Sequence, residues 1–592
     1  MKKTNIIILI FITLISIFTV CVCRYKNNAL FKGKNERSIN ISYEKIQNDI
    51  DNEIKKYASN KEITIDSPKI IVNPYNNSPL TALIIFYTDY STSIKLYIND
   101  IYMTTIESSK SHIIPVYGLR ENYNNKIVIV DEKETKKELY IVTNKIDNNS
   151  FYNYKTKFDE NSQLFLNSSR GKYAIDNNGY ISWFMNINTL KMNISENKVI
   201  YMNDIYGNLV ETDFMGRIYK KYYSNTNFDD HYIKVLDNGN IMGIINYNII
   251  SILDYKTGEY KDIVDVCEIL KKIDNDIIIE PSNFYLNYFQ YNDKDNTILL
   301  SIRGLNCIIY YDLNKNEIIW IFSNNSIISN KFNKYKLKLI NGEYVTGQHT
   351  PYLVGNCLYV FNNGIFKDGT IGTYNEETSF PVIYEINGME IKEVYRYGST
   401  YLSGWYGSFY EKDNIKNINY GCIINNDKGK YSKVIEVDKD DNIISDFSTN
   451  FNSTLIYQSH RNTFYEEITP NYDLNVKYET IINNIDNVKH DINLYEVNYY
   501  KSANYFKKNI KSSMIDETLI MLNNDVLETN VSQEFELLFV DKNYNHYNMI
   551  INNGDTVIGI QDLFFSNIRG KYAIYIKFNN KYYDTNLVLN IT

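Results

Sequence analysis

The sequence predicts an all-β protein with several domains, and three observations support this prediction. The chain has 592 residues, more than one small domain holds. It contains 56 tyrosines together with many isoleucines and valines, and aromatic and β-branched side chains favour strands. Short apolar segments alternate with turns of Asn, Asp and Gly over most of its length. A hydrophobic content of 44% is sufficient to build buried cores.

The N-terminal segment, residues 1–28, has the pattern of an export signal or membrane anchor. Lys2 and Lys3 precede an apolar run that extends to Cys23. A positively charged start ahead of a short apolar stretch directs a chain to export, and this run is long enough to remain in a bilayer. We therefore expect an exported protein, periplasmic or at the cell surface. Its tether would be an uncleaved signal anchor or a lipid on Cys21 or Cys23.

Four further segments follow from changes in the apolar pattern. The first is a helical linker whose residues 42–58 have apolar positions at helical spacing. Short strands with turns between them then indicate a compact β-sandwich, and a longer series of strands follows it. The expected boundaries are 29–69 for the linker, 70–148 for the β-sandwich, 149–475 for the long series and 476–592 for a C-terminal linker with a small β-domain.

The long central series has a weak internal repeat. Its unit is a turn of Asn, Asp and Gly followed by an apolar strand, as in DNNGYISWFM, LDNGNIMGII, NDKDNTILLSI and DLNKNEIIWIF. Many strands at even spacing with turn residues between them are typical of a barrel, a sandwich or a propeller. The length of the region and its degenerate unit fit a β-propeller best.

Composition and motifs exclude several classes of function. The net charge is -8 and no basic block occurs, whereas a nucleic-acid partner requires clustered Lys and Arg. Cys267, Cys307, Cys357 and Cys422 are scattered without a CxxC pair, which argues against zinc, and no disulfide pairing can be derived. The chain contains no HExxH, no GxSxG and no Gly-rich phosphate loop. No metal or organic cofactor is implied, and the oligomeric state, including a homodimer, stays open.

Histidine is the scarce residue with chemical potential, since the chain has only six. His231 and His349 lie beside turns in the central region, within FDDHYIKVLDNGN and YVTGQHTPYLVGN. In a propeller, residues near the starts of the inner strands converge on the central axis. Two histidines in comparable repeat contexts are therefore candidates for a site, although a hydrogen-bonded structural role for each remains open.

Longer segments in a fixed order resemble the bacterial arylsulfate sulfotransferase family. They are NPYNNSPLTALIIF, HIIPVYGL, IDNNGYISWF, HYIKVLDNGNIM, GQHTPYLVGNCLYVFNNG and VIYEINGMEIKEVYRYGSTYLSGWYGS, and the similarity extends over about residues 70–465. The resemblance implies a six-bladed propeller with a small N-terminal β-sandwich. It also implies transfer of a sulfuryl group from a phenyl sulfate to a phenol through a sulfated histidine, without a nucleotide donor.

By position in the GQHT motif, the family's nucleophile corresponds to His349, and its first blade histidine corresponds to His231. An imidazole suits both nucleophilic attack and proton transfer near neutral pH. Arg303 and Asn287 match family residues that stabilise the sulfate oxygens. Arg303 offers a planar fork of donors, and Asn287 offers an amide donor.

Three positions depart from the family's pattern. Tyr285 replaces a histidine at the start of YLNY, and Gly304 replaces another at the end of SIRG. Trp405 occupies a loosely aligned position in YLSGWYGS, where it would offer a stacking face to an aryl ring. We include Tyr285 and Trp405 as candidate substrate-binding residues.

Three functional hypotheses follow. The leading one is an aryl-sulfate sulfotransferase with small phenyl sulfates and phenols as its substrates, because His231, Asn287, Arg303 and His349 occur together. The second is a non-catalytic surface propeller that binds a ligand, favoured by the replacements at the other positions. The third is a sulfate-ester hydrolase, in which water replaces the phenol. The natural donor and acceptor do not follow from the sequence.

Overall fold

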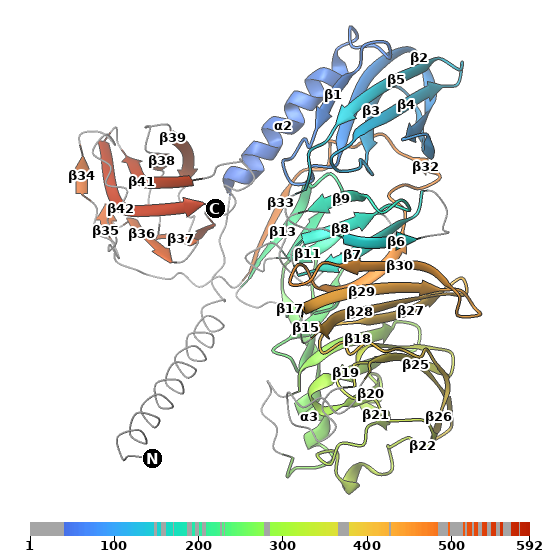
Figure 1. Ribbon diagram of the computed structural model, residues 1–592. Helices are drawn as coiled ribbons and strands as arrows, with labels where there is room; N and C mark the ends of the chain where they lie inside the picture. Colours follow the sequence, from blue (N-terminus) through green and yellow to red (C-terminus); the bar gives the residue numbers. More distant parts are fainter. Residues whose placement is uncertain are drawn as a thin grey trace, which may run out of the picture. The chain divides into compact units, whose positions relative to one another are not determined.

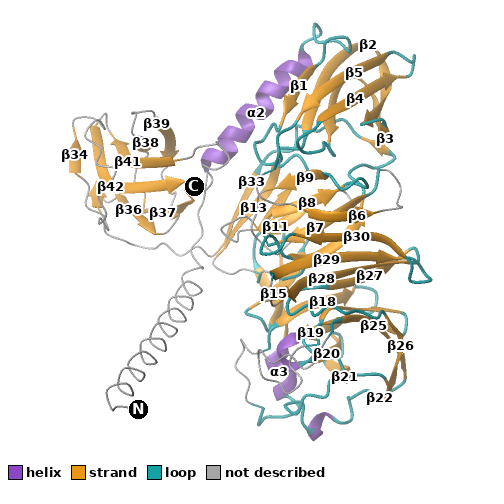
Figure 2. Cartoon of the chain, in the orientation of Figure 1, coloured by secondary structure: helices purple, strands orange, loops and turns teal. Residues whose placement is uncertain are grey.

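The computed structural model is built almost entirely from β-sheets, with few helices (Figures 1 and 2). It describes residues 41–146, 151–155, 161–169, 171–185, 192–195, 200–203, 209–224, 228–229, 231–277, 284–364, 378–425, 428–483 and strands between 495 and 591. The chain divides into a larger unit, Glu44–Tyr222 with Phe228–Ile481, and a smaller unit that contains Ile482–Thr592. The all-β class predicted from the sequence is confirmed.

The helix expected over residues 42–58 is α2, Ile41–Ser59. Its buried face includes Gln47, Asp51 and Ile54. Arg217 of the propeller donates from Nη2 to Asp51 Oδ2 at 2.6 Å, and Tyr75 donates to Asp51 Oδ1 at 2.7 Å. This carboxylate therefore joins the helix to two parts of the larger unit.

The N-terminal β-domain is a six-stranded sheet in the order β32-β3-β2-β4-β5, with β1 paired to β2. Its strands are β1 (Lys69–Val72), β2 (Ala82–Ile98), β3 (Ile101–Val116), β4 (Asn124–Asp131), β5 (Lys136–Val142) and β32 (Ile468–Thr469). The last of these comes from far along the chain and pairs in parallel with β3. The core of the N-terminal β-domain is apolar because alternate positions of β2 face inward, as the alternation of apolar and polar residues along this strand requires.

Six further sheets of four or five strands make up the propeller, and each is one blade. Blade 1 consists of β31 (Ile456–Asn462), β7 (Gln163–Ser168), β8 (Gly171–Ile175) and β9 (Ile181–Met185). Blade 2 consists of β10 (Met192–Ile194), β11 (Ile200–Asn203), β12 (Leu209–Thr212), β13 (Ile218–Ser224) and β33 (Glu479–Asn483). Blade 3 consists of β14 (Ile233–Val235), β15 (Ile241–Ile245), β16 (Ile249–Leu253) and β17 (Tyr260–Asp265).

Blades 4 to 6 follow in chain order. Blade 4 consists of β18 (Leu286–Asn292), β19 (Thr297–Ile302), β20 (Cys307–Asp312) and β21 (Glu317–Phe322). Blade 5 consists of β23 (His349–Val354), β24 (Cys357–Asn362), β25 (Phe380–Asn387), β26 (Glu390–Arg396) and β22 (Lys338–Asn341). Blade 6 consists of β27 (Ser408–Lys412), β28 (Ile415–Asn425), β29 (Gly429–Val437), β30 (Ile443–Thr449) and β6 (Phe151–Lys155). The helical pieces between them are α3 (Val266–Lys271), η2 (Arg303–Leu305) and η3 (Asn330–Phe332).

The repeat unit seen in the sequence corresponds to hairpin turns of the blades. In blade 3 the Gly239 amide donates to Leu236 O at 2.8 Å, and in blade 1 the Gly179 amide donates to Asp176 O at 3.0 Å. Both glycines have φ of +85°, which an L side chain rarely adopts. The Asn-Gly ending of these turns therefore follows from backbone geometry.

The ring of blades is closed by strands from its two ends. β31, from the C-terminal end of the propeller, pairs antiparallel with β7, and β6 from its N-terminal end pairs with β30. A buried ion pair crosses this junction, because Arg461 on β31 reaches Glu436 on β29 with an Nη2–Oε2 distance of 2.6 Å. Glu436 is completely buried, so the Arg461 guanidinium replaces the water that would otherwise solvate it.

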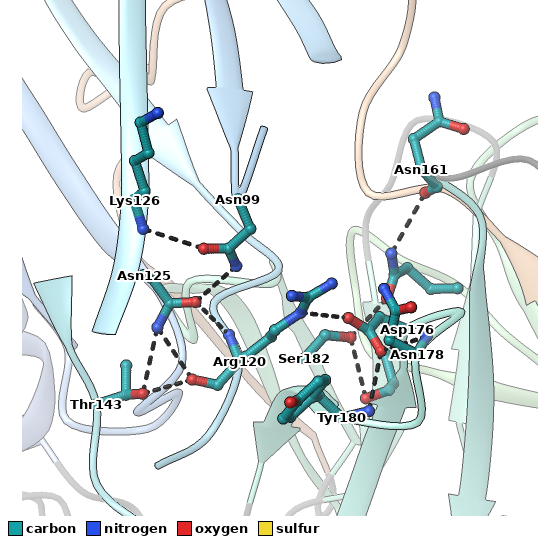
Figure 3. A network of polar contacts seen from close by, with 12 residues as sticks. Asn99, Arg120, Asn125, Lys126, Thr143, Asn161, Asp176, Asn178, Tyr180 and Ser182 are labelled. Atoms are coloured by element: carbon teal, nitrogen blue, oxygen red, sulfur yellow. Dashed lines mark hydrogen bonds and ion pairs between the residues drawn. The ribbon is translucent and has the colours of Figure 1, made fainter. Parts of the chain in front are cut away.

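A second polar network joins the N-terminal β-domain to blade 1 (Figure 3). Arg120 donates from Nε to Asp176 Oδ2 at 2.6 Å, and the Asp176 Oδ1 accepts the Asn178 and Tyr180 amides at 2.9 Å. The Asn125 side chain bonds both backbone polar groups of Arg120. The two domains therefore share a hydrogen-bonded joint in addition to their continuous apolar core.

The smaller unit contains two sheets, as expected for a small C-terminal β-domain. Their orders are β34-β42-β41-β38-β39 and β35-β36-β37-β40. The strands are β34 (Tyr495–Val497), β35 (Ser513–Ile515), β36 (Thr518–Asn523), β37 (Val526–Asn530), β38 (Phe535–Val540), β39 (His546–Ile551), β40 (Val557–Gly559), β41 (Gly570–Phe578) and β42 (Lys581–Ile591). Leu538, Ala573 and Tyr575 are buried within it.

The predicted signal or anchor, with Cys21 and Cys23, lies outside the described residues. Among the helices that the structure describes, none combines the length and apolarity needed to cross a membrane. Cys267, Cys307, Cys357 and Cys422 are free thiols.

We expect Arg461→Met to destabilise the propeller strongly, because it leaves the Glu436 carboxylate buried without its cation. Breaking a buried pair from one side costs about 3–5 kcal/mol. Chemical unfolding of the domain measures this loss. The control is Lys136→Met, which removes an exposed pair to Glu138 at 2.7 Å and should cost less than about 1 kcal/mol. Equal effects of the two substitutions would contradict a role for the buried pair in closing the ring.

Candidate active site

The starts of the innermost strands bring residues from five blades together. His231 lies two residues before β14, Tyr285 directly precedes β18, and His349 is the first residue of β23. Tyr406 lies two residues before β27, and Tyr457 is the second residue of β31. The inner strands of successive blades lie against one another, so these side chains reach a common site from different blades.

His349 lies at the buried centre of this cluster, with 4% of its surface exposed. Its Nδ1 is 2.7 Å from Asn363 Oδ1. Burial, with smaller contributions from the charges of Arg303 and His231, lowers the pKa of His349 to about 3; the Asn363 side chain and the Gly347 backbone oppose the shift. The imidazole is therefore neutral at physiological pH, the state in which a ring nitrogen can act as a nucleophile.

The Asn363 side chain, whose Oδ1 contacts His349, is also held through its Nδ2. It directly follows β24 and is completely buried. Its Nδ2 donates to two backbone carbonyls, Ser403 O and Tyr406 O, each at 2.8 Å. The backbone carbonyl of Asn363 accepts a hydrogen bond from Ser379 Oγ at 2.8 Å. The loop that precedes β27 is thus attached to the residue that holds His349.

Arg303 is positioned by the short helix η2, in the turn between β19 and β20. Its side chain is buried, and its Nη2 lies 3.5 Å from Gly404 O. The guanidinium carbon is 5.4 Å from the centre of the Tyr285 ring, within the range of a cation–π contact. Its positive charge also contributes, after burial, to the lowered pKa of His349.

His231 is surrounded by tyrosine rings. The ring centroids of Tyr285, Tyr247 and Tyr457 lie 5.6, 6.0 and 6.2 Å from its own, all edge-on. The Tyr457 centroid also lies 6.3 Å from that of the His349 ring, so this tyrosine is close to both histidines. Burial raises the pKa of Tyr457, and its protonated hydroxyl donates to Asn287 O at 3.1 Å.

Asn287, on β18, is completely buried beside β23, the strand that begins with His349. Its Nδ2 donates to Gln348 O at 2.8 Å, one residue before His349. Its Oδ1 has no hydrogen-bond partner in the described part of the chain. One Nδ2 hydrogen is therefore used to support the backbone of His349, and the second is the donor left for a ligand oxygen.

Tyr285 has one face occupied by Tyr247 and contacts Arg303. It stacks on Tyr247 with ring centroids 5.2 Å apart and an interplanar angle of 13°. Its φ is +48°, and 39% of its surface is exposed. Arg303 lies at cation–π distance from this ring, so Tyr285 connects the stack to the guanidinium.

Trp405 is held differently from the other predicted residues. Its ring is 40% exposed, with Lys430 Nζ 4.1 Å from the centroid. The neighbouring residues Gly404 and Tyr406 supply the carbonyls that contact Arg303 and Asn363. The loop that contains Trp405 thus joins the cluster through its backbone carbonyls, while the indole of Trp405 packs against the Lys430 ammonium group of blade 6.

The sequence reasoning identified His231, Tyr285, Asn287, Arg303 and His349, which the contacts described above connect. It missed Asn363, Tyr247, Tyr406 and Tyr457. Asn363 is the second Asn of the VFNNG segment, directly after a strand, a position that could have been noticed. The tyrosines gave no signal, because the chain has 56 of them.

The cluster combines a neutral buried imidazole, a guanidinium and a second imidazole, a set suited to group transfer from an anionic ester. No three His, Cys, Asp or Glu side chains are grouped as metal ligands within the described ranges.

Comparison with known proteins agrees with this arrangement. The chain matches the family model "Arylsulfotransferase (ASST)" over residues 125–458, more than half of its length. It also matches "Arylsulfotransferase Ig-like domain" over residues 69–148. No curated protein sequence matches the chain at a significant level.

Several solved structures show a weak likeness. A putative 6-phosphogluconolactonase from Bacteroides fragilis has 10% identity and a TM-score of 0.30, covering 63% of this chain and 99% of its own. The periplasmic gluconolactonase of Pseudomonas aeruginosa has 9% identity and a TM-score of 0.30, covering 64% and 99%. Hydrazine synthase from Kuenenia stuttgartiensis has 11% identity and a TM-score of 0.30, covering 48% and 74%. Likeness at this level has no bearing on function.

The two family models cover the N-terminal β-domain and nearly all of the propeller, including all six of the predicted site residues. The chain therefore belongs to the arylsulfotransferase family, whose general activity is the transfer of sulfuryl groups between aryl compounds.

Proposed function

We propose that this chain moves a sulfuryl group from a phenolic sulfate ester to a phenol acceptor through a covalent sulfohistidine on His349, without a nucleotide donor. The observation that carries the proposal is the buried imidazole of His349, held at Nδ1 by Asn363 at 2.7 Å, while the loop that Asn363 holds also contacts the buried guanidinium of Arg303. Burial lowers the pKa of His349, which supports the neutral form that a nucleophile requires.

In the first half-reaction, a ring nitrogen of His349 attacks the sulfur of the donor. The N–S bond forms while the bond from sulfur to the phenolic oxygen breaks, and its electron pair leaves with the phenolate. Sulfuryl transfer resembles phosphoryl transfer in spreading charge over the equatorial oxygens. Arg303 supplies fixed donors to those oxygens, with the second Nδ2 hydrogen of Asn287 as a further donor.

In the second half-reaction, the acceptor phenol attacks the sulfur of the sulfohistidine. The new O–S bond forms, the N–S bond breaks, and its electron pair returns to the imidazole. His231 protonates the departing phenolate in the first step and takes the acceptor's proton in the second, so its protonation state is restored after each cycle. The tyrosine rings around His231 offer an apolar, aromatic lining for an aryl group.

Export to the periplasm or the cell surface, with a membrane tether at the N-terminus, belongs to the same proposal. It rests on the charge and apolar pattern of residues 1–28 and fits a reaction that needs no nucleotide donor. Fractionation of cells that express the full chain tests it, and recovery of all full-length protein from the cytoplasm would refute it.

We expect His349→Ala to abolish transfer, because no other group can carry the sulfuryl intermediate. The protein is incubated with a chromogenic aryl sulfate, with and without added phenol, and phenolate release is followed. Wild-type release should rise with phenol, and the variant should lose at least about 1,000-fold in rate. His460→Gln is the control, since His460 packs on Phe165 in blade 1 and should retain activity.

Two results with the wild type and one with the variant would count against the proposal. Release that is unaffected by phenol would indicate hydrolysis by water. Absence of turnover with several donors would favour the non-catalytic binding propeller. Full activity of the His349→Ala variant would remove the nucleophile from the mechanism.

We expect Arg303→Met to shift the acid limb of the kcat/KM profile to higher pH. Burial and, to a smaller extent, the charge of Arg303 lower the pKa of His349 to about 3, so without this charge the imidazole becomes protonated, and hence inactive, at a higher pH. The rate at neutral pH should also fall by about 100-fold, from loss of oxygen stabilisation. Arg303→Lys keeps the charge and should leave the acid limb nearly in place. An unchanged limb in the Met variant would separate Arg303 from His349.

We expect Tyr285→Phe to retain most of the activity and Tyr285→Ala to lose about 10-fold or more. Phe keeps the stack on Tyr247 and the ring face near Arg303, whereas Ala removes both. Steady-state rates with a donor at saturation measure the difference. A large loss in the Phe variant would instead assign the Tyr285 hydroxyl a role as a proton donor.

A further inference from the structure

The amide of Asn363 can have only one orientation in its site. Nδ2 faces the Ser403 and Tyr406 carbonyl oxygens, both at 2.8 Å. Rotating the amide by half a turn would place Oδ1 against two oxygens that cannot donate a hydrogen. The oxygen of Asn363 must therefore point at His349 Nδ1, 2.7 Å away. This contact determines which nitrogen of the His349 imidazole carries the hydrogen.

An amide oxygen accepts hydrogen bonds and cannot donate them, so Nδ1 must carry the hydrogen. In a neutral imidazole only one nitrogen is protonated, and the other then holds a lone pair. We infer that Asn363 is a positioning residue that locks His349 in the Nδ1–H tautomer, which makes Nε2 the atom that receives the sulfuryl group. This inference rests on the proposed function.

The lock acts on both half-reactions. As the Nε2–S bond forms and the S–O bond to the donor breaks, positive charge develops on the ring and is shared by Nδ1–H. The hydrogen bond to Asn363 Oδ1 becomes charge-assisted and therefore stronger at that moment. When the acceptor oxygen takes the sulfuryl group, the electron pair returns to Nε2 and Nδ1 keeps its hydrogen. No proton has to move on His349 during the cycle.

A neutral acceptor suits this nucleophile better than a carboxylate. A negative partner at Nδ1 would favour the imidazolium and raise the pKa of His349, in opposition to burial and Arg303. The amide fixes the tautomer without adding charge. The same amide also holds the loop whose Gly404 carbonyl contacts Arg303, so the nucleophile and the guanidinium share one support.

The experiment compares three variants of the full chain with wild type. Asn363→Leu removes the acceptor, and Asn363→Asp keeps an acceptor but adds a charge. Ser379→Ala is the matched control: it removes bonds to Asn363 O and Ser403 N at 2.8 Å and loosens the same loop, but leaves the contact with His349. Thermal unfolding is recorded for each, and kcat, KM and the pH profile are measured with a chromogenic aryl sulfate and excess phenol.

We expect kcat of Asn363→Leu to fall by about 100-fold or more, with KM for the donor changed less than about 3-fold, as a wrong histidine tautomer costs turnover rather than binding. In Asn363→Asp the acid limb of kcat/KM should move up by about one pH unit or more. Ser379→Ala should keep kcat within about 3-fold and the pH profile unchanged, even where it unfolds as early as the Asn363 variants.

Two outcomes would overturn the inference while wild type remains active. In the first, all three variants lose activity in proportion to their stability with an unmoved acid limb, which makes Asn363 purely structural. In the second, Asn363→Leu retains full kcat, so that the tautomer is fixed elsewhere. An inactive wild type would instead refute the proposed function. The comparison of wild type with His349→Ala tests that function separately from the role of Asn363.

Discussion

The pairing of β31 with β7 is the constraint on which the rest of the propeller depends. Residues more than 280 positions apart are joined at this junction, as in the hydrogen bond from Thr454 to Ser168. Without this pairing, the first blade would lack its inner strand and expose a row of unsatisfied backbone groups. With it, the inner strands surround one axis, and residues at their starts are brought together. The site exists because the ring is closed.

Burial and charge act in the same direction on the pKa of His349. Removal of His349 from water and the proximity of Arg303 both oppose protonation, so the imidazole stays neutral where most histidines would begin to titrate. The cost of burying polar groups is offset by hydrogen bonds from residues of several blades, Asn363 and Asn287 among them. A rigid site of this kind holds its donors in place before the substrate arrives, which is the condition for stabilising charge in a transition state.

The departure at Tyr285 changes the physical character of the site. Where the family resemblance implies an imidazole, this chain has a phenol ring stacked on Tyr247 and close to Arg303. The ring offers an aromatic surface that can orient a cation. In the proposed mechanism, proton transfer therefore depends on His231 alone.

Much of the fold could be predicted from the sequence. The spacing of apolar residues depends only on neighbours along the chain, so it predicted the β-class of most of the protein and the helix α2. It predicted short strands in the N-terminal β-domain, where β2 is instead one strand of 17 residues. Turn residues predicted hairpins, because Gly179 and Gly239 have to adopt positive φ whatever surrounds them. The membership of blades could not be predicted in this way. β6 joins blade 6, β33 joins blade 2 and β32 joins the N-terminal sheet, since these pairings depend on contacts between distant parts of the chain.

The same division holds for the site. Scarcity and motif identified His231, His349 and Arg303, because those residue types have chemistry that stands out in any context. Asn363 and Tyr457 did not stand out, since Asn and Tyr are abundant in this chain. Their roles arise only when the ring of blades places an amide oxygen 2.7 Å from one imidazole, and a phenol ring 6.2 and 6.3 Å from two imidazole rings. The sequence by itself determined the strands, the turns and the reactive residue types. The tertiary structure decided which polar groups meet and which protonation state they impose, because burial and the distance between charges are properties of the folded chain.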